Sequence, residues 1–143
     1  MTTVVFYIFV FLSIYVQVFL LVTFLERHRE IKRRVGRVTP SRFPSITIAV
    51  PCWNEEQTLE HTVNSLLKIN YPQNQLQIFL IDDGSTDSTL ERMRAFEKYP
   101  NVKVFHKENG GKYTALNLSL EHCSTELFGC LDADSFVHSD ALR

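Results

Sequence analysis

The sequence is poor in cysteine and glycine, and both shortages argue against particular classes of protein. Its three cysteines, Cys52, Cys123 and Cys130, are odd in number and show no Cys-x-x-Cys spacing, which argues against a zinc site or a disulfide framework. We expect three buried, reduced thiols instead. Only five glycines occur, and none lies in the turn after the first predicted strand, where a nicotinamide-dependent oxidoreductase needs them.

Charge is missing from the N-terminal segment, because no charged residue lies between Thr2 and Leu25. A helix of this length can cross a hydrocarbon core of about 30 Å. No basic residues precede the apolar run, which argues against a cleaved signal peptide. Many basic residues follow the run, which favours a cytoplasmic location for the part of the chain after it. We therefore predict a membrane protein with a single-pass helix at 1–25, a basic linker at 26–44 and a cytoplasmic domain at 45–143.

The net charge of −1 conceals two regions of opposite sign. Residues 26–44 carry seven Lys and Arg against two acids, whereas residues 45–143 carry eight Lys and Arg against fourteen acids. Binding a polyanion usually needs a basic surface that replaces the phosphate counterions. The acidic body is therefore not expected to bind nucleic acid, although a nucleotide held through a metal ion is compatible with it.

The body alternates between strand-like and helix-like patterns. Four short apolar runs are typical of buried strands: 46–50, 76–81, 102–105 and 127–131. Between them, apolar residues recur at helical spacing. This alternation predicts an α/β fold, with a mainly parallel sheet and helices on both of its faces.

Two local patterns describe the predicted helices more closely. Ser88-Thr89-Leu90-Glu91 has the sequence of a capping box, in which the Ser88 and Glu91 side chains would cap the start of a helix. In the last helix one face is predicted to consist of Tyr113, Leu116, Leu120 and Cys123.

Polar residues follow each predicted strand, at the edge where ligands bind in open parallel sheets. The carboxylates among them would repel one another unless a cation lay between them. Asp132 and Asp134 stand two positions apart, and hard carboxylate oxygens at this spacing suit Mg²⁺ or Mn²⁺ holding a diphosphate. Ala133 would then point away from the site. The alternative is a solvated, capped turn, in which such triplets are common.

The other strand-end loops leave comparable alternatives open. Asp82 and Asp83 either form an ordinary turn or accept hydrogen bonds from a nucleotide base. Lys112 either enters a helix from a flexible turn or neutralises phosphate at the start of that helix. Trp53 either fills the core or stacks on a base.

Taken together, four motifs resemble the glycosyltransferase family 2 pattern over about residues 45–140. These motifs are Pro-Cys-Trp-Asn-Glu-Glu, Ile-Asp-Asp-Gly-Ser-Thr-Asp, Asn-Gly-Gly-Lys-x-x-Ala-Leu-Asn and Asp-Ala-Asp-Ser. With the preceding apolar helix, the chain is similar to membrane polysaccharide synthases of the poly-N-acetylglucosamine and hyaluronan type. The resemblance implies the nucleotide-binding half of a GT-A, Rossmann-like domain.

The resemblance also implies a role for individual residues. Pro51 and Glu55 would line a pocket for a UDP-sugar, and Asp83 would contact the uracil. Lys112 would approach the nucleotide. Asp132, together with Asp134, would hold the metal and the diphosphate.

The implied reaction is an inverting transfer of the sugar to a saccharide or lipid acceptor, in which a carboxylate base deprotonates the acceptor hydroxyl and the metal stabilises the departing diphosphate. The family places its base beyond Arg143, so we expect this chain to be the N-terminal, donor-binding part of the enzyme. A non-catalytic, membrane-anchored binding module is one alternative.

A haloacid-dehalogenase-type phosphohydrolase is a second alternative, because it also uses an Asp-x-Asp after a strand. That motif normally follows the first strand and has Thr or Val two places beyond the second Asp. Here Phe136 takes that place and three strands precede the motif, which disfavours this alternative.

Overall fold

A computed structural model of the chain describes residues 2–34 and 42–142. The chain divides into two units, Met1–Thr39 and Pro40–Arg143. Residues 35–41, which belong to the expected linker, lie outside the described residues.

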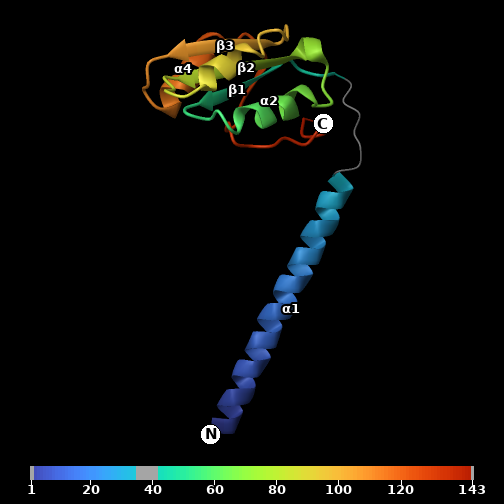
Figure 1. Ribbon diagram of the computed structural model, residues 1–143. Coiled ribbons are helices and arrows are strands. Elements are labelled where there is room, and N and C mark those ends of the chain that lie inside the picture. The colour runs from blue at the N-terminus through green and yellow to red at the C-terminus, as the bar shows by residue number, and fades with distance from the viewer. Residues whose placement is uncertain (1, 35–41, 143) are drawn as a thin grey trace. The chain divides into compact units, whose positions relative to one another are not determined.

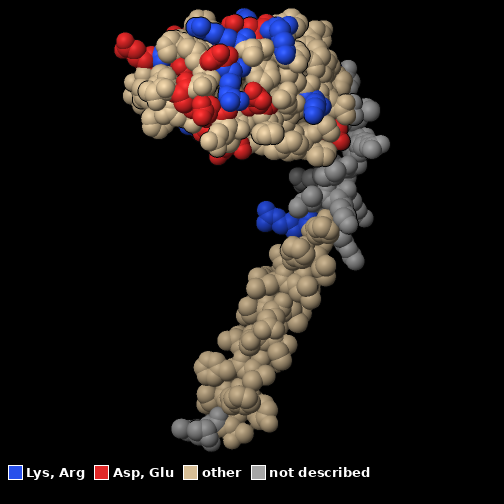
Figure 2. Space-filling view, in the orientation of Figure 1, with Lys and Arg blue, Asp and Glu red and all other residues tan. Residues whose placement is uncertain are grey.

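The first unit contains one long helix, α1 (Thr2–Arg34). Its segment Thr3–His28 has a mean hydropathy of 2.5, so its length and composition are sufficient to cross a membrane. Figure 2 shows that acidic and basic atoms are absent from most of its surface. The helix does not end at Leu25 but continues through the basic residues up to Arg34.

The second unit is built on a four-stranded sheet in the order β3-β2-β1-β4, with every neighbouring pair parallel (Figure 1). Its strands are β1 (Ile46–Cys52), β2 (Leu76–Asp83), β3 (Val102–Lys107) and β4 (Leu127–Cys130). The sheet confirms the predicted α/β fold.

Strand β2 is longer than its apolar run predicts, because Asp82 and Asp83 belong to the strand instead of to the turn. In the register of β2 with β3, Asp82 lies beside His106 and Asp83 beside Lys107. Acidic side chains opposite basic ones stabilise a strand pair. The neighbouring strand therefore extends the ladder into a segment that turn propensities alone would end.

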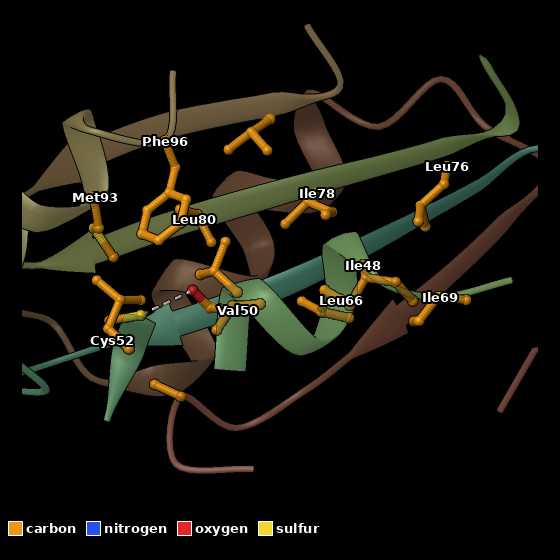
Figure 3. Close-up of a cluster of buried hydrophobic side chains, with 14 of the residues drawn as sticks. Ile48, Val50, Cys52, Leu66, Ile69, Leu76, Ile78, Leu80, Met93 and Phe96 are labelled. Atoms are coloured by element: carbon orange, nitrogen blue, oxygen red, sulfur yellow. Dashed lines mark hydrogen bonds between the residues drawn. The ribbon is translucent and has the colours of Figure 1, made fainter. Parts of the chain in front are cut away.

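Helices cover both faces of this sheet, as predicted. On one face, α2 (Leu59–Leu67) and α3 (Thr89–Arg94) pack on the larger core cluster, which includes Ile78 and Leu80 (Figure 3). A 3₁₀ turn, η1 (Gln73–Gln75), precedes β2. On the other face, α4 (Lys112–Glu121) packs on a smaller cluster.

Strand alternation divides β2 between the two clusters. Ile78 and Leu80 belong to the larger cluster, whereas Phe79 and Ile81 belong to the smaller one. All four side chains are fully buried. Burial of a side chain of this size contributes roughly 1.5–3 kcal/mol. β2 is therefore the central element that carries the site at its carboxyl end.

The predicted face of α4 is mostly wrong. Tyr113 and Leu120 are 69% and 51% exposed, whereas Ala115 and Ser119 are fully buried. The Ser119 hydroxyl donates to the Ala115 carbonyl at 2.8 Å, so burial leaves no unpaired polar group there. Small side chains on this arc let the helix lie close to the sheet. Leu116, which is partly buried against the smaller cluster, is the member of the predicted face that does pack inward.

The predicted capping box is also wrong. Ser88 is the N-cap of α3, but its side chain makes no capping hydrogen bond. The Asp87 carboxylate accepts from the Thr89 N–H at 3.0 Å instead, and the Ser88 N–H donates to the Glu56 carboxylate at 3.2 Å. Because Glu56 comes from the turn after β1, a tertiary contact replaces the local cap.

The thiols differ from the expectation as well. Cys52 is buried, but Cys123 is only half-buried and Cys130 is exposed. Burial, followed by the nearby charges of Glu55 and Asp82, raises the pKa of the Cys52 thiol. Its Sγ donates to the Val50 carbonyl at 3.3 Å, so Cys52 is an inert structural thiol.

We expect Gly84→Ala to lower the free energy of unfolding by roughly 2–3 kcal/mol. Gly84 has φ +72°, and an added Cβ would lie 2.6 Å from the Asn109 backbone nitrogen. Urea unfolding followed by Trp53 fluorescence measures the loss. The matched control is Gly129→Ala, whose Cβ would meet the flexible end of Ile48 at 2.9 Å. Equal losses in the two variants would contradict the argument from backbone conformation.

Candidate functional site

A cavity of about 510 Å³ lies at the carboxyl ends of the strands. Strand order reverses here, since the chain runs from β1 to β2 and β3 on one side and then to β4 on the other. Such a switch point is where open parallel sheets bind ligands. The cavity brings together all six residues to which the family resemblance gave a role: Pro51, Glu55, Asp83, Lys112, Asp132 and Asp134. Five further residues complete its lining: Cys52, Trp53, Asn109, Gly111 and Ala133.

Hydrogen bonds tie the turn after β1 to the turn after β2. Asn54 adopts a left-handed conformation with φ 56°. Its backbone N–H donates to the Ser85 hydroxyl at 3.0 Å, and its side-chain oxygen accepts from the Thr86 N–H at 2.8 Å. The adjacent Glu55 N–H donates to Thr89 Oγ1 at 2.8 Å. These contacts fix the segment that carries Trp53 and Glu55 at the cavity wall.

Trp53 is 57% exposed on this wall, so it does not fill the core. The sequence left two alternatives open for Trp53, a place in the core or stacking on a base. Its exposed position leaves the ring available for stacking on a ligand.

Asp83 holds the loop that joins β3 to α4, which we call the 107–112 loop. Its Oδ1 accepts from Lys107 Nζ at 2.6 Å and from the Gly110 N–H at 3.1 Å. Its Oδ2 accepts from the Gly111 N–H at 2.8 Å. The Asp83 side chain is only 5% exposed. One carboxylate therefore orders the backbone that leads into α4.

These contacts also determine the charge of Asp83. Burial alone raises the pKa of this carboxyl. The hydrogen bonds from Lys107, Gly110 and Gly111, with the charge of Lys107, together lower it by more, so its pKa lies below the ordinary 3.8. Asp83 is ionised at neutral pH.

A carboxylate has about four acceptor positions, and the loop uses three of those of Asp83. The predicted contact of Asp83 with a uracil N–H would take the remaining position. That contact stays a prediction.

Asp82 lies deeper than Asp83 and does not line the cavity. Its side chain is fully buried, with Oδ2 2.7 Å from His106 Nδ1 and Oδ1 accepting from the Ser85 N–H at 3.2 Å. The sequence left open which of the two aspartates faces the ligand. In the structure Asp83 lines the cavity and Asp82 does not, because successive side chains point to opposite faces of a strand.

Asp132 and Asp134 are held at the cavity by the residue between them. Ala133 is buried, and its carbonyl accepts from Thr62 Oγ1 at 2.6 Å. Both aspartate residues are exposed and line the cavity, whereas Ala133 is buried in the larger core cluster and also borders the cavity. Lys112 Nζ donates to Asp132 Oδ1, and this contact raises the pKa of Lys112 above its ordinary 10.5. Within the described part of the chain, Asp134 makes no hydrogen bond or ion pair.

The described residues contain no group of three or more His, Cys, Asp or Glu side chains placed to hold a metal. Asp132 and Asp134 provide hard oxygen ligands on their own. Mg²⁺ is often bound by one or two carboxylates and completes its shell with water and substrate phosphates. The pair therefore fits a cation that shares its coordination with a diphosphate, and it does not fit a metal bound by protein ligands alone.

The contribution of Lys107 could not be found from the sequence. A lysine after an apolar run is ordinary on a protein surface, and its role depends on the β2–β3 register, which sets it beside Asp83. The ion pair of Lys112 with Asp132 joins residues 20 positions apart and has no local signal either.

The family model for glycosyl transferase family 2 matches residues 47–143. The chain belongs to this family. Membership confirms the resemblance found in the four motifs and sets aside the phosphohydrolase alternative.

Two curated relatives are poly-beta-1,6-N-acetyl-D-glucosamine synthases. The chain is 38% identical to the one from Staphylococcus epidermidis over 97 residues, covering 67% of this chain and 23% of the relative. It is 33% identical to the one from Staphylococcus aureus (strain COL) over 117 residues, covering 79% of this chain and 28% of the relative. The chain thus spans about a quarter of the length of these relatives.

Two solved structures share the fold of the second unit. S. aureus TarS 1-349 in complex with UDP superposes with a TM-score of 0.65 at 27% identity, over 68% of this chain and 30% of that one. The mannosyltransferase PcManGT from Pyrobaculum calidifontis, in complex with GDP-Man and Mn²⁺, superposes with a TM-score of 0.64 at 29% identity, over 78% of this chain and 35% of that one. These likenesses confirm the predicted GT-A type of fold.

Proposed function

We propose that this chain forms the donor-binding part of a membrane-bound glycosyltransferase that transfers a sugar from a UDP-sugar to a saccharide or lipid acceptor. One observation carries the proposal: a single cavity at the switch point of the sheet gathers the acidic pair Asp132 and Asp134 with Lys112 and Asp83. A nucleoside diphosphate needs this combination of groups, because it presents a base at one end and phosphates at the other. Family membership favours this function over a non-catalytic binding module.

Each residue of the cavity has a proposed part in donor binding. Pro51 and Glu55 line the nucleotide pocket, and Asp83 accepts a hydrogen bond from the uracil. Lys112 neutralises phosphate at the start of α4, where the helix dipole also favours an anion.

Asp132 and Asp134 hold Mg²⁺ or Mn²⁺ with the diphosphate. The cation, when bound, stabilises the charge on the departing diphosphate. Support for a metal comes from these two hard ligands and from the Mn²⁺ in the mannosyltransferase complex. The accompanying reaction is an inverting displacement, in which a carboxylate base outside this cavity deprotonates the acceptor hydroxyl.

Uridine is the proposed base of the donor. The TarS structures hold UDP or UDP-GlcNAc, and the curated relatives are named as synthases of an N-acetylglucosamine polymer. The GDP-Man complex has a TM-score comparable to those of the TarS complexes, so GDP is the natural competitor to test.

The proposed location is the membrane, with one pass through α1 and the second unit in the cytosol. Support comes from the apolar segment Thr3–His28 and from the basic residues that follow it in the sequence. Activated sugars are cytosolic metabolites in most cells, so this orientation suits a donor-binding site.

Calorimetry on the full chain in detergent micelles tests the proposal. We expect UDP to bind in the presence of Mn²⁺, to bind much more weakly when EDTA removes the metal, and to bind more tightly than GDP under the same conditions. Equal binding of UDP with and without metal, or no binding in either condition, would contradict the metal-bridged donor site.

A further inference from the structure

Lys112 donates a hydrogen bond to Asp132 Oδ1, on the carboxylate that the proposed function assigns to the metal. We propose that Lys112 occupies this ligand in the nucleotide-free protein, so that the site binds a divalent cation more weakly alone than together with a diphosphate. This inference rests on the proposed function and adds a coupling between the two ligands.

The positions of Lys112 and Asp132 allow their ion pair to break and each residue to take another partner. Lys112 is the first residue of α4, and the preceding Gly111 is fixed by the Asp83 carboxylate. The base of the lysine is therefore held in place while its side chain remains 56% exposed. The Asp132 side chain is 58% exposed, and no second hydrogen-bond partner of it is recorded among the described residues. Ammonium and carboxylate can separate without opening the core.

Charge explains why the cation alone is disfavoured. Lys112 is the basic residue of the cavity lining, and its ammonium contacts Asp132 directly, whereas Asp83 is paired with Lys107. A divalent cation that binds Asp132 must displace the lysine and then lies next to the positive charge of the lysine ammonium. Like charges at such short range repel one another, which is costly even in a solvated site.

A diphosphate removes this cost. Its oxygens accept the hydrogen bonds of the released Lys112 ammonium and also coordinate the cation. Asp132 Oδ1 becomes free for the metal at the same moment. Metal and nucleotide therefore raise each other's affinity, and this coupling must be reciprocal.

Lys112→Gln separates the two effects of the lysine. Removal of an exposed ion-pair partner is expected to raise the affinity for Mn²⁺ alone by about twofold to fivefold. Loss of a charged hydrogen-bond donor to phosphate is expected to lower the affinity for UDP in the presence of Mn²⁺ by about tenfold or more. The opposite signs distinguish exchange from a general loss of binding.

The experiment uses the full chain in detergent micelles, with free Mn²⁺ quantified by electron paramagnetic resonance and UDP binding measured by calorimetry. Lys68→Gln is the matched control, since Lys68 is an exposed lysine at the far end of α2 and does not line the cavity. Lys112→Arg keeps the charge and is expected to retain the low affinity for Mn²⁺ alone. Circular dichroism checks that each variant is folded.

Two outcomes would overturn the inference. The first is an affinity of Lys112→Gln for Mn²⁺ alone that equals or falls below that of the unmodified chain. The second is a gain in Mn²⁺ affinity without any loss of UDP binding. Failure of the unmodified chain to bind UDP with Mn²⁺ would instead contradict the proposed function.

Discussion

Asp134→Asn is expected to weaken the binding of UDP in the presence of Mn²⁺ by roughly 100-fold. Loss of an outer-shell partner typically costs about 10- to 100-fold in metal affinity, so loss of a direct ligand should reach the upper end of that range. Asp134 is exposed at the cavity, and it forms no ion pair with the described residues that would compensate its charge. An amide of the same shape keeps the volume of the side chain but removes the negative charge that the cation needs.

Titration of UDP into the variant and into the unmodified chain, both at the same subsaturating concentration of Mn²⁺, measures this loss. Glu97→Gln serves as the control for net charge, because Glu97 is exposed after α3 and does not line the cavity. We expect it to bind like the unmodified chain. If Asp134→Asn retained full metal-dependent binding, the cation would have to be held by other groups.

Asp83→Ala is expected to lower the free energy of unfolding by about 2–4 kcal/mol. The change removes the acceptor for Lys107 Nζ and for the Gly110 and Gly111 N–H groups at once. Because the Asp83 side chain is only 5% exposed, we expect water to replace the lost carboxylate incompletely. The 107–112 loop then loses its order, and donor binding falls with it.

Asp83→Asn and Asp132→Ala provide a graded comparison by urea unfolding. The asparagine keeps one acceptor oxygen but turns an amide donor toward the backbone donors of the loop, so we expect an intermediate loss. Asp132→Ala removes only an exposed partner of Lys112 and should leave stability nearly unchanged. Equal stability of Asp83→Ala and Asp132→Ala would show that Asp83 does not anchor the loop.

The low pKa of Asp83 also predicts a dependence of stability on pH. The Asp83 carboxyl binds a proton less tightly in the folded state than in the unfolded state, in which its pKa is near 3.8. The contribution of ionised Asp83 is therefore complete above about pH 4 and is lost as the pH falls through the folded-state pKa. Asp87, whose pKa is also lowered, acts in the same direction.

Urea unfolding at several values between about pH 6 and pH 3 follows this loss. The unmodified chain should lose stability steeply on the acid side. In Asp83→Ala the free energy of unfolding should fall less steeply as the pH is lowered. Asp87 and other carboxylates would account for the remaining decrease. Parallel acid limbs in the two proteins would exclude Asp83 as a source of the pH dependence.

Much of the fold could be predicted from the sequence, because its determinants are local. Apolar runs such as 76–81, alternating with helical spacing, are sufficient to predict a parallel sheet with helices on both faces. The location of the site follows from the same pattern, since parallel strands bring their carboxyl ends to one edge. For this reason the residues after the strands, from Pro51 to Asp134, could be predicted to meet before any contact was known.

Other features were decided only by contacts between distant segments. The sequence allowed either Asp82 or Asp83 to lie at the site, and the orientation of β2 between its two core clusters determined that Asp83 lines the cavity. Helical periodicity predicted an apolar face on α4, but close packing on the sheet selected the small residues Ala115 and Ser119. Periodicity reflects the secondary structure that a segment forms by itself. It does not predict which distant residue a side chain will contact, so the pairing of Lys112 with Asp132 is determined by the tertiary structure alone.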